Sequence, residues 1–94
     1  MNVREEIVEI LDKIENENNA ENIHKMISDC FTISKYSDDD DLKFLCFLML
    51  SLRLLELEIK ELKDIISELK EYIIEENYVD GILTVKEFIT KHVK

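Results

Sequence analysis

Few residues in this 94-residue chain are of types that could carry chemistry. The two histidines, His24 and His92, fall on different predicted helices, and neither has a neighbour at the spacing of zinc ligands. The single glycine, Gly81, cannot build a phosphate-binding loop, and no serine lies in a nucleophile elbow. We therefore predict a protein that is not an enzyme and that uses no cofactor.

Four consecutive aspartates, Asp38, Asp39, Asp40 and Asp41, form the densest charge cluster. Carboxylates in such a run could bind a divalent cation. They could also lie at the positive end of a helix, with Ser37 and Asp40 forming a variant of the capping box. We favour capping, and we note the four aspartates as a possible surface for a basic partner.

A second candidate for cation binding lies near the C-terminus. The nine residues 80–88 resemble the second half of an EF-hand loop, with Gly81 at loop position six and Glu87 at position twelve. The resemblance implies Asp80 and Glu87 as weak metal-ligand candidates. The pattern departs from an EF-hand because Tyr78 stands where a carboxylate is needed. An alternative interpretation is a turn at Asp80 and Gly81, followed by a helix that Thr84 and Glu87 cap.

The cysteines and the N-terminus bear on the cellular setting. Cys30 and Cys46 each lie in an apolar stretch, which favours free thiols that pack in a core. The N-terminal residues do not resemble a signal peptide, so we expect a reducing, cytoplasmic location.

Residues 44–50 are all apolar, but this run is shorter than the roughly 18 residues of a membrane span. We predict instead a helical segment that is buried on all sides, and no membrane association.

Composition limits the fold to long helices. The chain has no proline and one glycine, so it offers few places to turn. Hydrophobic periodicity predicts a single all-α domain over residues 1–94, with helices at about 3–16, 20–34, 38–77 and 84–93. Asn19 is the predicted N-cap of the second helix. The first two helices would form a short hairpin packed on one long central helix, and the last helix would fold back on it.

The long central helix carries a heptad repeat. Apolar residues alternate at steps of three and four from Leu45 to Ile73, a spacing typical of coiled coils. The predicted interface consists of Leu52, Leu55, Ile59, Leu62, Ile66, Leu69 and Ile73. Apolar flanks such as Ile65 and Tyr72 favour a bundle of more than two helices. We expect a homodimer of either chain direction, and a monomer remains the alternative.

The repeat invites comparison with leucine-zipper transcription factors, but a basic region should precede the zipper. Aspartates stand there instead, which excludes direct DNA binding by that route. Residues 1–41 carry 12 acidic and 4 basic side chains, a net charge of −8 out of −10 for the chain. This field repels nucleic acid and favours basic partners, or it serves only solubility.

The sequence thus predicts a small acidic helical protein that acts through protein–protein interaction and associates with itself. One alternative is an acidic decoy that inhibits a nucleic-acid-binding enzyme, as DNA mimics of phage or virus type do. The usage of Ile, Lys, Glu and Asn would suit an AT-rich genome or a mobile element. A second alternative is a calcium-responsive module based on the EF-hand-like segment.

Overall fold

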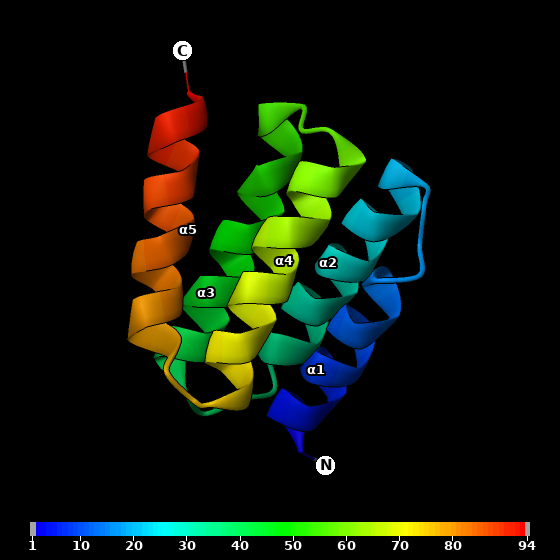
Figure 1. Cartoon of the computed structure of the whole chain (residues 1–94). Coiled ribbons are helices and arrows are strands. Elements are labelled where there is room, and N and C mark those ends of the chain that lie inside the picture. Colours follow the sequence, from blue (N-terminus) through cyan, green and yellow to red (C-terminus); the bar gives the residue numbers. More distant parts are fainter. Residues whose placement is uncertain (1, 94) are drawn as a thin grey trace.

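Five α-helices pack side by side in the computed structural model, which describes residues 2–93 (Figure 1). Within these residues there is no β-strand. One 3₁₀ turn, η1, interrupts the succession of helices. The elements are α1 (Val3–Ile14), α2 (Ala20–Ser34), α3 (Asp40–Leu50), η1 (Ser51–Leu55), α4 (Ile59–Ile74) and α5 (Tyr78–His92).

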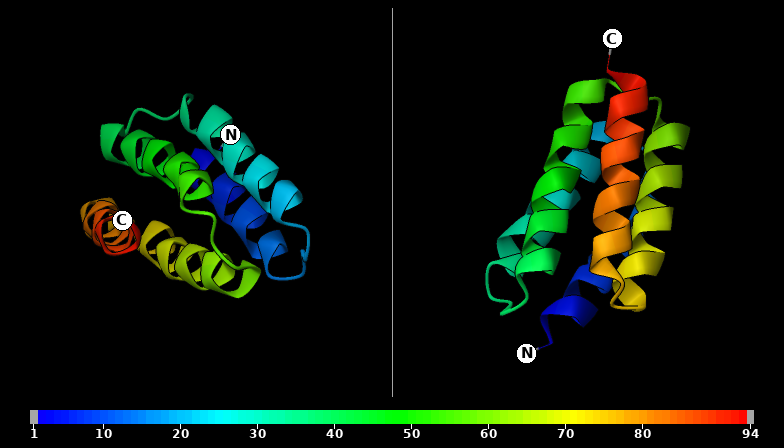
Figure 2. Two further views of the ribbon diagram at one scale, coloured as in Figure 1. Left: turned by 90° about the horizontal axis from the view of Figure 1, so that it is seen from above. Right: turned by 90° about the vertical axis from the view of Figure 1, so that its left-hand side faces the viewer.

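The five helices form a closed ring around one hydrophobic core (Figure 2). Going round the ring, the order is α1, α2, α3, α5, α4, so each helix packs against two neighbours. The chain runs up and down in turn, and α5 lies between α3 and α4 (Figures 1 and 2). As a result α3 and α5 are parallel neighbours, whereas the other adjacent pairs are antiparallel.

Short polar side chains begin the first three helices. The side-chain oxygens of Asn2 and Asn19 accept hydrogen bonds from backbone N–H groups in the first turns of α1 and α2. The predicted bounds of the second helix and its N-cap, Asn19, are therefore confirmed. For α3 the cap is Asp39, whose Oδ1 accepts from two backbone N–H groups. Ser37 lies outside the helix, where its hydroxyl accepts from the N–H of Asp39.

The continuous helix predicted over residues 38–77 does not occur. The chain leaves α3 through η1, Glu56 adopts a left-handed conformation with φ of 52°, and Glu58 is extended before α4 begins. The physical reason lies in the apolar content of residues 42–57. A straight rod of this length would leave that segment largely exposed, whereas a reversal lets α4 and α5 help to bury it. The long axis of the bundle is accordingly only 35 Å.

The last helix begins earlier than residue 84, the predicted start. Residues 78–92 form one continuous helix, so Asp80 and Gly81 make no turn, and Thr84 and Glu87 lie in the helix interior. Gly81 is needed for packing. A Cβ atom there would lie 2.9 Å from Leu45 Cδ2 and 3.3 Å from Tyr72 Cβ. The missing side chain thus lets α5 approach both α3 and α4 closely.

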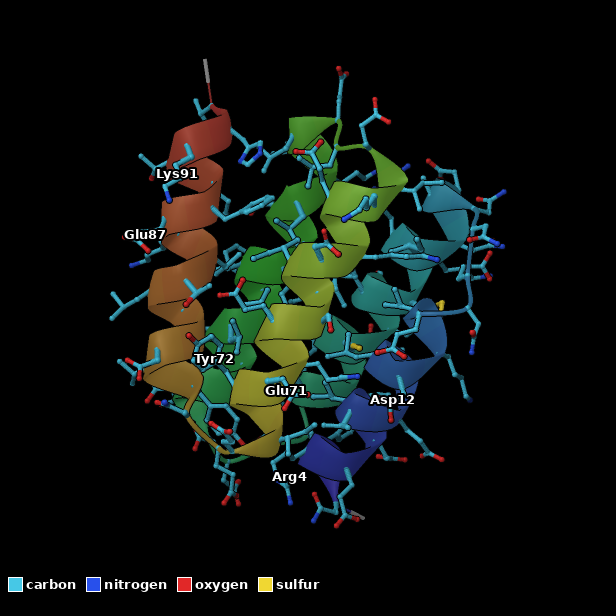
Figure 3. The ribbon with its side chains drawn as sticks, in the orientation of Figure 1. Arg4, Asp12, Glu71, Tyr72, Glu87 and Lys91 are labelled. Atoms are coloured by element: carbon cyan, nitrogen blue, oxygen red, sulfur yellow. The ribbon has the colours of Figure 1, made fainter. Side chains whose placement is uncertain are left out.

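A lysine between α1 and α4 closes the ring. Lys70 is buried, and its Nζ donates to Asp12 Oδ1 at 2.9 Å and to Glu15 Oε1 at 3.0 Å. Asp12 is labelled on α1 in Figure 3, beside α4. The hydrogen bonds to Asp12 and Glu15 raise the pKa of Lys70 above its ordinary value. The ammonium therefore stays charged and ties the two helices together.

None of the helices within residues 2–93 combines the length and the apolar character needed to cross a membrane.

The reversal at Glu56 can be tested by whether one substitution raises or lowers the free energy of unfolding. Glu56→Gly should raise the free energy of unfolding by about 1 kcal/mol, because glycine adopts the left-handed conformation without steric cost. In a continuous helix the same change would lower it by about 1 kcal/mol. Urea unfolding measures the difference. The control, Glu58→Gly, replaces an extended residue and should lower stability by about 0.5 kcal/mol; a loss at both positions would contradict the reversal.

The close approach at Gly81 predicts a cost for any larger side chain. Gly81→Val should lower the free energy of unfolding by about 2 kcal/mol, because Leu45 is buried and the Cβ of Tyr72 is fixed to the α4 backbone. Thr90→Val, on the exposed side of the same helix, should change it by less than about 0.5 kcal/mol. Equal effects of the two variants in urea unfolding would show that the helices are not in close contact at Gly81.

The Lys70 cluster predicts a stability difference that disappears at high pH. The variant Asp12→Asn/Glu15→Gln should be less stable than wild type by about 1 kcal/mol at neutral pH. The pKa of Lys70 is raised in the folded protein. The stabilising contribution is therefore complete at pH values below 10.5, the ordinary pKa of lysine, and is lost as the pH rises through the pKa of Lys70 in the folded state. Urea unfolding at a series of pH values measures the difference. The control, Asp64→Asn, removes an exposed ion pair to Lys60 and should be as stable as wild type at every pH. If the double variant remained less stable than wild type in strong alkali, its loss of stability could not come from the charge of Lys70.

Candidate functional site

The residues predicted to form a seam between two chains lie mostly inside one chain. Five of the seven are almost completely buried: Leu52, Leu62, Ile66, Leu69 and Ile73. The other two, Leu55 and Ile59, are partly buried and pack against the same core. These side chains are already covered by neighbouring helices, so a seam between two chains at these positions is not supported.

The predicted metal ligands do not come together. Asp80 and Glu87 lie two turns apart on α5, and the EF-hand-like loop is absent because these residues are helical. Asp80 Oδ2 accepts a hydrogen bond from Asn77 Nδ2 at 2.8 Å, and Glu87 points away from the bundle (Figure 3). Across residues 2–93 no three His, Cys, Asp or Glu side chains are grouped so that they could hold a metal ion.

The four aspartates surround the start of α3. Asp39 is the N-cap, and Asp40 and Asp41 are in the first turn, where the helix dipole favours negative charge. Asp40 also forms an exposed ion pair with Lys43 at 3.3 Å. The predicted role of the cluster in helix capping is therefore observed, although the capping residue is Asp39 rather than Ser37.

The two thiols are sealed in the core. Cys30 and Cys46 are both fully buried and free. Burial raises the pKa of the Cys46 thiol to about 12 and shifts the pKa of Cys30 in the same direction. Since the thiolate is the reactive form, both side chains behave as small apolar core residues.

An exposed apolar face lies over the parallel pair α3 and α5. Eight large apolar side chains of the described residues are exposed, and six of them lie on these two helices and the segments that extend them. We call them the α3–α5 face: Phe44, Phe47, Leu54, Val79, Leu83 and Val93. Figure 2 shows α3 and α5 next to each other on the side of the bundle opposite α1. Phe47 is 53% exposed and Leu54 is 81% exposed, so much apolar surface remains in contact with solvent.

Aromatic rings and lysines mark the edges of this face. The ring centroid of Phe47 lies 6.4 Å from that of Phe44 and 6.0 Å from that of Phe31 on α2. Lys35 Nζ lies 4.8 Å from the centre of the Phe31 ring, and Lys86 Nζ lies 5.4 Å from that of Phe44. These contacts orient the rings and place positive charge beside them.

At its upper end the α3–α5 face continues into an open hollow. Leu54, Leu55 and Val93 line it together with Glu56 and His92, and its volume is about 470 Å³. His92 is held in place, since its Nδ1 lies 2.9 Å from the carbonyl oxygen of Phe88 and its Nε2 lies 3.3 Å from Glu61 Oε2. The hollow adds a recess at the upper end of the α3–α5 face.

The face also has an unusual charge for this protein. Residues 42–55 contain Lys43 and Arg53 but no carboxylate, although the chain as a whole carries a net charge of −10. The carboxylates lie mainly on α1, on α4 and in the connecting segments. On α5 the carboxylates of Asp80 and Glu87 are matched in number by Lys86 and Lys91, so the α3–α5 face repels another acidic molecule less than α1 does, which carries four carboxylates and two basic side chains.

The prediction that residues 44–50 are buried on all sides is wrong. A helix in this ring has only two neighbours, so one side of α3 must face outward, and Phe44 and Phe47 lie on that side. The sequence does carry a signal for this face. Phe44, Phe47 and Leu54 form a second apolar stripe beside the heptad positions, and a helix with only two neighbours cannot bury both stripes at once.

The structure and its surface define an all-helical bundle with one uncovered apolar face. Comparisons with known families, curated proteins and solved structures find no match for this chain.

Proposed function

We propose that the protein is a small interaction module that associates with a second copy of itself through the α3–α5 face. The observation that carries the proposal is the concentration of exposed apolar side chains on this face. Single exposed apolar residues are common on protein surfaces, but six of the eight exposed ones among the described residues lie on α3, α5 and the segments that extend them, and such a concentration is typical of an interface.

The charge of the molecule favours a second copy as the partner for this face. Two molecules that each carry a charge of −10 repel wherever their acidic surfaces meet. On the α3–α5 face they can approach without opposing carboxylates between residues 42 and 55. In a two-fold arrangement with antiparallel helices, Asp40 and Asp41 at the lower end of one copy would lie opposite the upper end of the other, away from the same aspartates of that copy.

Size and residue types also suit this proposal. The bundle is 35 Å long, so a face that runs along two of its helices has the length of a standard interface, in which each partner buries ~800 Å². Phe44 and Phe47 are exposed aromatic side chains of the kind that dominate binding energy at interfaces. Lys35 and Lys86 at the edges would form the polar rim.

The proposal keeps the self-association expected from the sequence and moves its site. The heptad residues cannot leave the core without unfolding the chain, whereas Phe47 and Leu83 are already exposed. Association through the α3–α5 face would therefore need no change in the fold of either copy.

Sedimentation equilibrium at tens to hundreds of micromolar tests the proposal. Wild type should approach twice the chain mass of 11.2 kDa. The variant Phe47→Glu/Leu83→Glu should remain at the mass of one chain, because each copy would bring two uncompensated charges into an apolar contact.

Tyr36→Glu/Ile74→Glu is the matched control, since it places the same two charges at the two exposed large hydrophobic residues of the described chain that lie outside the face. This variant should dimerise like wild type. Circular dichroism should show the same helix content for all three proteins. A monomeric wild type at the highest concentration, or equal dissociation of the control, would contradict association through the α3–α5 face.

A further inference from the structure

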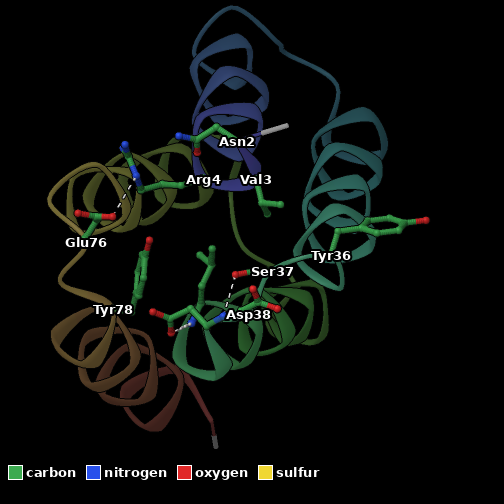
Figure 4. A pocket seen from close by; sticks show the side chains of 10 residues that line it. Asn2, Val3, Arg4, Tyr36, Ser37, Asp38, Glu76 and Tyr78 are labelled. Atoms are coloured by element: carbon green, nitrogen blue, oxygen red, sulfur yellow. Dashed lines mark hydrogen bonds and ion pairs between the residues drawn. The ribbon is translucent and has the colours of Figure 1, made fainter.

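An open pocket lies at the end of the bundle where α1, α3 and α5 begin and where α2 and α4 end (Figure 4). Its volume is about 630 Å³, which is within the range of ligand-binding clefts. Val3 and Leu42 contribute apolar lining, and most of the other lining residues are polar or charged. The pocket shares no residue with the α3–α5 face.

Tyr78 supplies an unused polar group in this pocket. Its side chain is only 8% exposed, and its hydroxyl points into the pocket (Figure 4). Among residues 2–93 the hydroxyl has no hydrogen-bond partner. Burial raises the pKa of Tyr78, and the charges of Glu76 and Asp39 act in the same direction. The phenol is therefore neutral and offers both an O–H donor and an oxygen acceptor to an incoming group.

The charged side chains of the pocket are mostly carboxylates. Arg4 is the only basic lining residue, and it is already engaged: its Nη1 donates to the carbonyl oxygen of Ile74 at 3.4 Å, and its Nε lies 3.6 Å from Glu76 Oε1. Asp39 is occupied as the cap of α3. The Asp38 side chain is exposed and is bound to no other described residue.

Three helix N-termini at this end would by themselves favour an anion. Two of them are already satisfied, because the side-chain oxygens of Asn2 and Asp39 accept from the first-turn N–H groups of α1 and α3. Asp38, Asp39 and Glu76 bring three negative charges against the single positive charge of Arg4. The pocket therefore favours a cationic group.

We propose that this pocket receives the guanidinium group of an arginine side chain from a basic partner protein. Glu76 and the Tyr78 hydroxyl, which lie on one side of the pocket, would accept its N–H groups, and Asp38 on the other side would add negative charge (Figure 4). A guanidinium is planar, carries five donors and packs against aromatic rings, which suits acceptors spread around a tyrosine. A lysine ammonium is a compact, strongly hydrated charge and uses such an arrangement less well. Asp39 would add to the field without leaving its role as a cap.

Isothermal titration calorimetry with N-acetyl hexa-arginine amide as the probe tests the proposal. The variant Asp38→Asn/Glu76→Gln should bind the peptide about tenfold more weakly than wild type, because hydrogen bonds to charged groups are lost. Tyr78→Phe, which keeps the ring and removes only the hydroxyl, should weaken binding about fivefold. Hexa-lysine should bind more weakly than hexa-arginine to wild type.

Glu9→Gln/Glu68→Gln is the matched control, since it removes the same net charge from exposed positions on α1 and α4. It should weaken binding by less than about twofold, because charges distant from the pocket are screened by salt. Urea unfolding verifies that all variants remain folded. If both double variants lost the same affinity for hexa-arginine, the peptide would be attracted only by the negative charge of the whole protein and not by the pocket. Equal binding of hexa-lysine, or no effect of Tyr78→Phe, would also overturn the proposal.

Discussion

The left-handed conformation of Glu56 is the constraint on which the arrangement of the later helices depends. It turns the chain so that α4 runs back alongside the bundle instead of extending α3. Because α4 packs on α1 rather than on α3, a position between α3 and α4 is left for α5. Gly81 permits α5 to occupy that position, since any side chain there would collide with Leu45 and Tyr72. Lys70 then fixes α4 to α1 and completes the ring.

The surface follows from the same arrangement. In a ring of five helices each element has one side toward the core and one side toward solvent. Most of the helices present charged residues outward, as the hydrophobic period predicts. By contrast α3 is apolar nearly all round, so closing the ring leaves Phe44 and Phe47 outside. An apolar face on an otherwise acidic molecule is thus a direct consequence of the composition of residues 42–55 and of the ring.

Local signals explain what could be predicted from the sequence. The all-helical class follows from the scarcity of glycine and proline, and Asn19 begins α2 as its short polar side chain predicts. The reversal at Glu56 has no such signal, because the residues around it are ordinary helix formers and the heptad spacing continues across the break. A period near 3.5 describes the core of a compact bundle as well as a coiled-coil seam. The sequence predicts a turn at Gly81, but the residue lies inside α5, where its lack of a side chain allows close packing between helices. That packing depends on residues distant in the sequence, Leu45 and Tyr72, so a local signal could not reveal it.

The two proposed binding surfaces differ in the physics that would drive them. Contact through the α3–α5 face would bury aromatic and aliphatic side chains, and salt affects such burial little at moderate concentration. Contact at the end pocket would pair exposed carboxylates with a cation, and ions in solution screen that attraction. Because the surfaces share no residue, occupation of one leaves the side chains of the other in place, and their free energies should add. An acidic bundle of this kind could thus be paired with itself through its apolar face while each copy keeps its acidic end free for a basic partner.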